Sequence, residues 1–217
     1  MRSSFRRELE LLQNSILKMG SMVADALDNA MTALKQRDME LAQRVIAEDD
    51  KIDALELEIE QKSLSLIALQ QPMAGDLRFL GTALKIITDL ERIGDNALSL
   101  AKVTINLGNQ PFIKPLIDLP RMAEICQKMI RDNLQAFVNR DHELAVKTAE
   151  LDHEIDHLYN QIFRELLVLM GEDPRNIRQS TYLLLAARHL ERIGDHATNI
   201  SEWIVYMVTG NRVDLNK

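Results

Sequence analysis

Cysteine, glycine, proline and aromatic residues are all scarce in this 217-residue chain. The one cysteine, Cys126, excludes an internal disulfide bond and a zinc site built from cysteines. Eight glycines and five prolines are too few for a turn-rich or largely disordered chain. Aromatic residues make up 4% of the chain, which disfavours β-sandwiches and barrels, because their strands favour aromatic and β-branched side chains. The hydrophobic fraction of 46% is nevertheless sufficient for an aliphatic core.

An excess of basic charge and long apolar runs are missing as well. The formal net charge is −7, whereas proteins that bind nucleic acids carry a basic surface, so nucleic acid is not an expected partner. No apolar segment typical of a signal peptide follows Met1, and no apolar run reaches about 18 residues, the length that indicates a membrane span. We therefore expect a cytoplasmic protein that is neither secreted nor inserted in a membrane.

Apolar residues recur with the spacing of α-helices along almost the whole chain, and no segment has the pattern of a strand. The expected fold class is all-α. Asp38 is a suitable N-cap, and Pro72 lies in the turn that ends the second helix. Two prolines in segment 109–115 mark a boundary between two domains, 1–109 and 110–217, each a three-helix bundle. The six helices are expected near residues 5–34, 39–69, 80–107, 119–137, 141–170 and 175–208.

The two halves are similar in sequence. Asp-Met-Glu-Leu-Ala at 38–42 matches Asp-His-Glu-Leu-Ala at 141–145, an offset of 103 residues. After the turns the offset is 100, and Leu-Glu-Arg-Ile-Gly-Asp-Asn-Ala at 90–97 matches Leu-Glu-Arg-Ile-Gly-Asp-His-Ala at 190–197. Seven of these eight positions are identical. The ordered matches indicate an internal duplication of a three-helix unit of roughly 100 residues, which makes the two bundles pseudo-symmetric.

Four acidic pairs with i, i+4 spacing lie inside the duplicated parts. They are Asp49/Asp53, Glu91/Asp95, Asp152/Asp156 and Glu191/Asp195. This spacing places both carboxylates of a pair on one helix face, about 6 Å apart. The first two pairs lie equally far from Pro72, and the last two lie equally far from the turn at Asp173 and Pro174. Each antiparallel hairpin therefore brings one acidic pair opposite another, and the pairs are expected to flank the apolar seam and face a surface groove.

Clustered carboxylates need compensation for their charge. At about 6 Å and an effective dielectric constant near 20, each like pair costs on the order of 3 kcal/mol before screening by water. Cations that prefer oxygen ligands, such as Fe, Mn, Mg, Ca or Zn, are natural candidates. Two alternatives stay open: the pairs are solvated helix faces, or Arg92 and Arg192 neutralise them through salt bridges.

Several residues near the pairs have open roles. Gly94 and Gly194 each cost a helix about 1 kcal/mol relative to Ala, so they indicate either a close approach beside the carboxylates or tight helix packing. The polar residues Asn96, His196 and Asn199 are candidate additional ligands, although residues of this kind are more often surface polar residues. Arg78 and Arg178 lie about 20 Å along the helix axis from the acidic residues, so they are expected to pair near the hairpin ends.

Enzyme motifs are not found. Glu-x-x-His occurs at 150–153 and 154–157, but both copies fall on one helix, whereas di-iron bundles need the motif on two helices. The chain has no phosphate-binding glycine loop, no dinucleotide-binding glycine motif and no His-Glu-x-x-His. Cys126 is expected in the core, and no residue is expected to be catalytic.

The sequence combines the tandem organisation, the acidic motifs and the two Leu-Glu-Arg-Ile-Gly-Asp-x-Ala blocks with the segments Phe5-Arg-Arg-Glu-Leu-Glu and Gln71-Pro-Met-Ala-Gly-Asp-Leu-Arg. In these features it resembles the bacterial PhoU family over nearly the whole chain. The resemblance implies two three-helix bundles that carry multinuclear metal clusters, reported as iron or zinc, on their outer surface. Carried onto this chain, it assigns the ligands Asp49, Asp53, Glu91 and Asp95 to one cluster and Asp152, Asp156, Glu191 and Asp195 to the other.

The resemblance also implies a cytoplasmic, non-enzymatic negative regulator of phosphate uptake and phosphate-starvation signalling. Its implied partners are the ATPase of a phosphate ABC transporter and a sensor histidine kinase, and a homodimer is expected. One rival hypothesis is a carboxylate-bridged metal-dependent hydrolase or a metal-storage bundle. Another is a purely structural helical dimer with solvated acidic stripes, whose function would survive replacement of Asp95 and Asp195 by Asn.

Overall fold

The computed structural model describes residues 2–216, and within this range the chain is helical and contains no strand. Its elements are α1 (Arg2–Gln36), α2 (Met39–Gln70), α3 (Ala74–Leu107), α4 (Asp118–Asn139), α5 (His142–Ala149), α6 (Asp152–Glu172), the short 3₁₀-helix η1 (Pro174–Asn176) and α7 (Ile177–Thr209). None of these helices is both long and apolar enough to cross a membrane. The predicted all-α fold is confirmed.

The same capped turn occurs once in each half. Asp38 accepts a hydrogen bond from the Leu41 amide at 2.9 Å, and Asp141 accepts one from the Leu144 amide at 3.0 Å. The residue before each cap, Arg37 or Arg140, has a positive φ and reverses the chain between two helices. A short acidic side chain satisfies an amide that the first helical turn leaves unpaired, which fixes the start of α2 and of α5. The N-cap predicted at Asp38 is confirmed.

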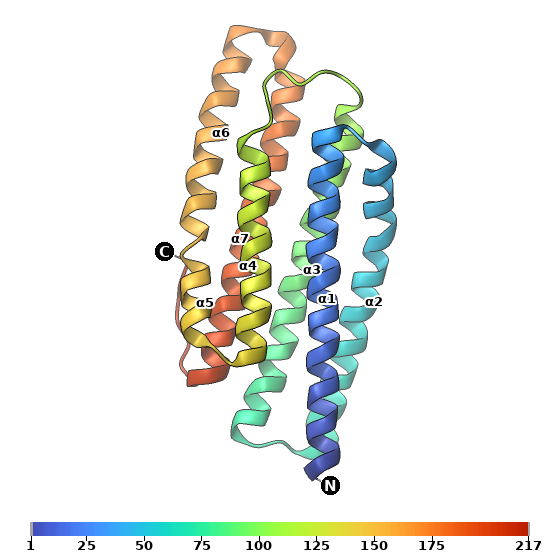
Figure 1. Cartoon of the computed structure of the whole chain (residues 1–217), viewed down its shortest axis with the longest axis vertical. Coiled ribbons are helices and arrows are strands. Elements are labelled where there is room, and N and C mark those ends of the chain that lie inside the picture. Colours follow the sequence, from blue (N-terminus) through green and yellow to red (C-terminus); the bar gives the residue numbers. More distant parts are fainter. Residues whose placement is uncertain (1, 217) are drawn as a thin grey trace.

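The helices form two antiparallel three-helix units that stand side by side (Figure 1). The first unit consists of α1, α2 and α3, and the second of α4, α5/α6 and α7. The units meet mainly where α3 packs along α7, with α1 against α4 beside them. One hydrophobic core, mostly aliphatic, continues through both units and includes Cys126. The division into domains at 109/110 falls in the linker before α4 and stays a prediction.

The seam between α3 and α7 is pseudo-symmetric in its polar contacts. Arg78 Nε of α3 donates to the carbonyl of Met207 at 3.5 Å, and Arg178 Nη2 of α7 donates to the carbonyl of Asn106 at 3.2 Å. Each arginine therefore reaches carbonyl groups near the C-terminal end of the other unit's long helix, which lack partners within their own helix. The expectation that these arginines pair near the end of their own hairpin was incomplete, because their partners lie in the opposite unit.

The helix predicted over 141–170 is divided at Glu150 and Leu151. Both residues keep right-handed helical angles, but the Leu151 amide bonds to the Thr148 carbonyl at 3.1 Å, and the Glu154 amide bonds to the Leu151 carbonyl at 3.1 Å. These three-residue hydrogen bonds tighten the turn and kink the helix between α5 and α6. The matching part of the first unit lies inside the continuous helix α2. The predicted fifth helix therefore consists of two consecutive segments, α5 and α6, which together occupy one place in the second unit.

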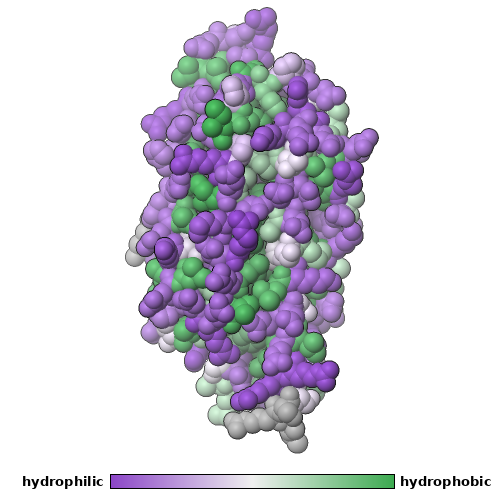
Figure 2. All heavy atoms as spheres, in the orientation of Figure 1, coloured by the Kyte–Doolittle hydropathy of each residue, from purple (hydrophilic) through white to green (hydrophobic). Residues whose placement is uncertain are grey.

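Most of the face seen in Figure 2 is covered by hydrophilic residues, with apolar residues between them. The apolar stripes of the helices are largely used within the bundle. Against this polar background, an exposed apolar stripe or a buried carboxylate is the exception that needs a reason.

Candidate functional site

The eight carboxylates form two groups of four, one in each hairpin. The first-half cluster is Asp49 and Asp53 on α2 with Glu91 and Asp95 on α3. The second-half cluster is Asp152 and Asp156 on α6 with Glu191 and Asp195 on α7. In both clusters carboxylates on one helix influence the pKa of carboxylates on the other helix, so each pair lies opposite its predicted counterpart.

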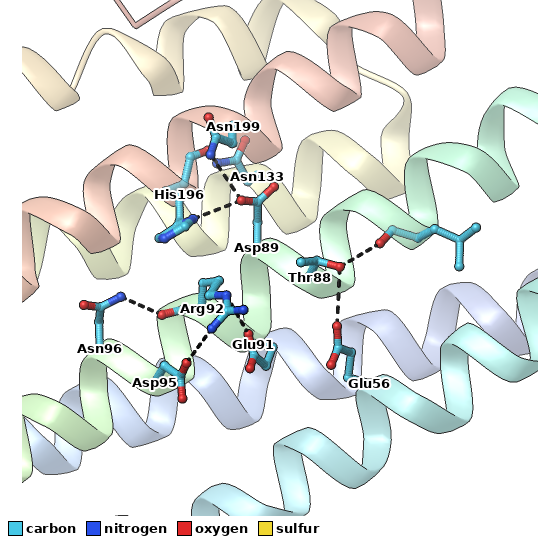
Figure 3. A network of polar contacts seen from close by, with 12 residues as sticks. Glu56, Thr88, Asp89, Glu91, Arg92, Asp95, Asn96, Asn133, His196 and Asn199 are labelled. Carbon is cyan, nitrogen blue, oxygen red and sulfur yellow. Dashed lines mark hydrogen bonds and ion pairs between the residues drawn. The ribbon is translucent and has the colours of Figure 1, made fainter.

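In the first-half cluster the carboxylates repel one another but an arginine lies among them. Burial raises the pKa of Asp49 to about 6, and repulsion by Asp53 and Asp95 adds to the effect. Burial also raises the pKa of Glu91, again with a contribution from Asp95. Arg92 pairs with both partners on α3, with Nη1 3.1 Å from Asp95 Oδ2 and Nε 3.3 Å from Glu91 Oε2 (Figure 3). The salt bridges of the alternative with Arg92 are therefore present, but they reach two of the four carboxylates, and the pKa values of Asp49 and Asp53 stay raised.

In the second-half cluster the carboxylates are more deeply buried. The side chain of Asp152 begins α6 directly after the kink, and the residue is only 6% exposed. Burial, followed by repulsion from Asp156, Asp195 and Glu191, raises the pKa of Asp152 to about 7. Asp152 Oδ1 and Glu191 Oε2 are buried without a hydrogen-bond partner in the described part of the chain. The expectation that all eight carboxylates face a surface groove was wrong for Asp152.

The cation of the second-half cluster is not the predicted one. Arg188 pairs with Glu191 Oε1, three residues further along α7. Arg192, at the position equivalent to Arg92, forms no ion pair among residues 2–216. The arginine at this position of the duplicated block therefore pairs with the acidic cluster in the first half only. The reason is that the rotamer of a long exposed side chain is not fixed by its position on the helix.

The two glycines of the duplicated blocks, Gly94 and Gly194, differ in how much space surrounds them. A Cβ atom on Gly194 would clash with Asp152 Oδ1 and would lie 2.9 Å from Ile155 Cδ1, so both atoms would be closer than non-bonded atoms approach. A Cβ atom on Gly94 would lie 3.4 Å from Ile52 Cδ1 and 3.6 Å from Asp49 Oδ1, which are ordinary contacts. Gly194 therefore serves both proposed purposes, because the carboxylate and the neighbouring helix both approach it closely.

The polar residues after the acidic pairs turn towards the α3/α7 seam. His196 Nδ1 lies 3.0 Å from Asp89 Oδ1, and the Asn199 amide donates to the same oxygen at 3.2 Å (Figure 3). Asn96 donates to the Arg92 carbonyl at 2.7 Å, and its amide oxygen lies 3.1 Å from His189 Nδ1. These contacts occupy the polar groups that the sequence offered as additional ligands.

Asp89 and His189 were not singled out from the sequence. They occupy equivalent positions at an offset of 100 residues, and so do their partners His196 and Asn96. The duplication therefore repeats one contact twice across the seam, once as Asp89–His196 and once as His189–Asn96. The signal was present in the alignment of the halves, but only the packing of α3 against α7 shows that these positions face each other.

A cleft of about 200 Å³ opens beside the first-half cluster. Its lining includes Asp25 and Asn29 of α1, Glu48 and Asp49 of α2, and Gly94 of α3. The equivalent of Glu48 in the second half is Leu151, which packs against the core at the kink. The first-half cluster therefore borders an open cleft, while the residue equivalent to Glu48 is turned inward in the second half.

The chemistry of the donor set fits a cation that prefers oxygen ligands, and the fit is better in the second half. Asp152 Oδ1 and Glu191 Oε2 are buried without a partner among the described residues, and the pKa values of both residues stay raised by burial and by repulsion within the cluster despite the ion pair of Arg188 with Glu191. As the side chains stand, however, no three acidic, histidine or cysteine side chains among the described residues are placed together as a set of metal ligands. The eight ligand assignments therefore stay predictions.

The PhoU domain model matches this chain twice, over residues 16–104 and 119–204. A phosphate-specific transport system accessory protein PhoU homolog from Clostridium acetobutylicum is 41% identical over 216 residues, covering 99% of each chain. A protein of the same description from Aquifex aeolicus is 43% identical over 207 residues, covering 95% of this chain and 94% of the relative.

Solved structures give the same result. The crystal structure of PhoU from Pseudomonas aeruginosa has 38% sequence identity and a TM-score of 0.92, and the match covers 95% of this chain and all of that one. The phosphate transport system regulatory protein PhoU from Streptococcus pneumoniae has 33% identity and a TM-score of 0.91, with 97% and 99% covered. Sequence, fold and internal repeat are therefore shared over almost the full length of both chains.

Proposed function

The chain belongs to the PhoU family, and on that premise we propose that it is a non-enzymatic accessory protein of a phosphate-specific transport system. The observation that supports this role most directly is the pair of PhoU domains together with full-length relatives described as accessory proteins of that system. Within the role, the protein links the ATPase of a phosphate ABC transporter to a sensor histidine kinase in the cytoplasm and lowers phosphate-starvation signalling when phosphate is plentiful.

The linkage works through differential binding. A partner changes the equilibrium between two states of a kinase only by as much as it binds one state more tightly than the other. Typical couplings between sites are about 1–3 kcal/mol, which corresponds to roughly 5- to 150-fold changes in affinity. A rigid bundle with one continuous core is suited to this task, because it presents surfaces on both units in a fixed relation.

The acidic clusters are the proposed metal sites. Asp49, Asp53, Glu91 and Asp95 would hold one group of ions and Asp152, Asp156, Glu191 and Asp195 the other, with iron or zinc as the first candidates and Mg, Mn or Ca as alternatives. Bound cations would supply the positive charge that the clusters lack. This chain's own residues supply oxygen ligands from two helices of each hairpin, so a bound cation joins α2 to α3 or α6 to α7.

Binding to the two partners tests the linkage. Purified protein is titrated with the purified transporter ATPase and, separately, with the cytoplasmic region of the kinase, and heat of binding is recorded. We expect saturable binding to both partners. Binding to neither would reject the adaptor role, and turnover of phosphate esters by the metal-loaded protein would favour the hydrolase hypothesis.

X-ray data recorded at the absorption edges of iron, zinc and manganese test the metal sites. Anomalous density between the four carboxylates of a cluster is the expected result. Crystals grown with excess metal that show no such density would reject metal binding without affecting the partner measurements.

A further inference from the structure

Helix α2 carries an apolar stripe on the face turned away from the bundle. Its exposed residues follow each other at alternating spacings of three and four: the apolar Ala54, Leu57, Leu64 and Ala68, with the polar Gln61 at the centre. The two leucines are 52% and 51% exposed. The opposite face of α2, which includes Ile52, Leu55 and Ile59, is buried against α1 and α3. Helix α2 therefore carries apolar residues on two faces, and within residues 2–216 only one of these faces is buried.

The second half shows that the fold does not require this stripe. At an offset of 103 residues, the equivalent positions on α6 hold His157, Asn160, Arg164, Leu167 and Gly171. Asn160 and Arg164 donate hydrogen bonds to carbonyls of their own helix at 2.9 and 3.1 Å, as solvent-facing polar residues do. Helix α6 also exposes the apolar residues Phe163, Leu167 and Val168, but these do not follow the alternating spacing of three and four. The two helices therefore differ in the pattern of their exposed apolar residues, and of the two only α2 has the spacing of a helix-pairing seam.

The spacing is that of a coiled-coil seam. Apolar residues that repeat every three and four positions let a second helix pack along the first, and alanines in the seam allow close approach. The stripe covers 15 residues, which corresponds to about 21 Å of helix. An occupant therefore needs a helical segment of at least about four turns.

The charges beside the stripe decide the kind of occupant. Asp53 and Glu60 on one side and Glu58 on the other occupy the flanking positions that face a partner helix in a coiled coil, and all three are exposed. A second copy of α2 would bring acidic flanks against acidic flanks in either orientation, which is unfavourable. A helix with lysine or arginine at its flanking positions would instead be attracted at every one of these contacts.

We propose that the outward face of α2 is a docking surface for an amphipathic helix of a partner protein, with an aliphatic seam and basic flanks. The inference is independent of the proposed function, since it rests on this face alone and would hold for a partner outside phosphate transport. It adds a second interaction surface next to the first-half cluster, because the flanking Asp53 is also one of the four carboxylates of that cluster.

A designed peptide tests the surface in the full-length protein. The probe has about three heptads, leucine at the seam and lysine at the flanks, and a matched peptide carries glutamate at the flanks. Binding is followed by fluorescence anisotropy at two salt concentrations. We expect the lysine peptide to bind, the glutamate peptide to bind at least about 10-fold more weakly, and added salt to weaken the lysine complex.

The matched variants use the natural difference between the halves. Leu57→Asn with Leu64→Asn gives the α2 stripe the asparagine that α6 has at position 160, and Leu167→Asn makes the same change on α6. The α2 double variant is expected to lose at least about 10-fold in affinity for the lysine peptide, and the α6 variant less than about 2-fold. All three altered leucines are about half exposed, so circular dichroism should show unchanged helix content.

Three results would overturn the proposal. Equal affinity of the double variant and the unaltered protein would show that the peptide binds by charge alone. Equal binding of the lysine and glutamate peptides would remove the charge argument. Self-association of the unaltered protein that the double variant abolishes, measured by sedimentation, would assign the face to a second copy of the chain.

Discussion

In the first half, α2 runs unbroken past Asp49, and Arg92 pairs with both Glu91 and Asp95. In the second half, the helix kinks just before Asp152, the carboxylate is buried, and two carboxylate oxygens are left without a partner. The two clusters have the same residue types at the same spacing. The comparison shows that the motif determines which side chains face each other. The local path of the backbone determines how deeply each carboxylate is buried, and therefore how much free energy its ionisation costs.

One residue accounts for much of this difference. Glu48 is exposed and pairs with Lys51 at 2.9 Å, whereas the equivalent Leu151 packs against the core. The side chain at this position therefore contacts the core in the second half and faces solvent in the first half. The neighbouring carboxylate of Asp152 is also buried, in a less polar environment where an unpaired charge is more costly.

The largest expected difference between the halves is in the pH dependence of stability. Burial raises the pKa of Asp152 from 3.8 to about 7 and that of Asp49 to about 6. Each raised pKa contributes stability below pH 3.8 that is lost as the pH rises through the folded-state value. When the pH of the metal-free protein is raised from 4 to 8, the free energy of unfolding of Asp152→Asn should increase by about 3 kcal/mol relative to that of the unaltered protein. For Asp49→Asn the relative increase should be about 1 kcal/mol, because Asp49 is more exposed to water.

Urea unfolding of the chelated protein at both pH values measures these free energies. Asp50→Asn serves as the control, since Asp50 is exposed beside Asp49 and its replacement should change stability by less than about 0.5 kcal/mol. A larger pH effect for Asp49→Asn than for Asp152→Asn would contradict the assigned difference in burial.

The two clusters should also differ in how strongly they bind added metal. If the carboxylates bind the ion as proposed, metal at about 100 times its dissociation constant stabilises the folded protein by about 2.7 kcal/mol. The second-half cluster should bind more tightly, because a metal in the first-half cluster must displace two ion pairs of Arg92, whereas one in the second-half cluster must displace the single ion pair of Arg188 with Glu191. Thermal unfolding with and without metal should therefore show a larger loss of stabilisation for Asp195→Asn than for Asp95→Asn, and the reverse order would reject this ranking.

The two glycines provide a test that needs no metal. Gly194→Ala places a Cβ atom against Asp152 and Ile155 and should destabilise the protein by about 1 kcal/mol despite the better helix propensity of alanine. Gly94→Ala meets only ordinary contacts and should be neutral or stabilise by up to about 1 kcal/mol. Denaturant unfolding of the pair measures the difference, and equal effects would mean that the close contacts at Gly194 are relieved at no cost.

The smallest effects concern the arginines. Arg92→Gln removes ion pairs with Glu91 and with the more exposed Asp95, and Arg188→Gln removes one with Glu191, so each should cost less than about 1 kcal/mol. Arg188→Gln should cost more, because the other carboxylate oxygen of Glu191 is already buried without a partner among the described residues. The difference should shrink at high salt. A larger cost for Arg92→Gln in chemical unfolding would indicate that its two contacts act together.

Much of the site was predictable because helical periodicity is regular. The i, i+4 spacing and the equal distances to the turns at Pro72 and Pro174 placed each acidic pair opposite its counterpart. Features that depend on contacts between helices were not predictable from spacing. Arg188 replaced Arg192 as the partner of the acidic cluster, and His196 turned to Asp89, because these side chains respond to the helix packed beside them.

The sequence by itself determined the helices, the cap at Asp38, the duplication and the family, since each depends on local pattern or on similarity along the chain. Only the tertiary structure decided that α3 and α7 exchange equivalent contacts, that the helix kinks before Asp152, and that one face of α2 has no partner within the bundle. The physical reason is that burial is a property of the packed molecule. The same acidic motif has carboxylates with different pKa values in the two halves, because one copy is more deeply buried than the other.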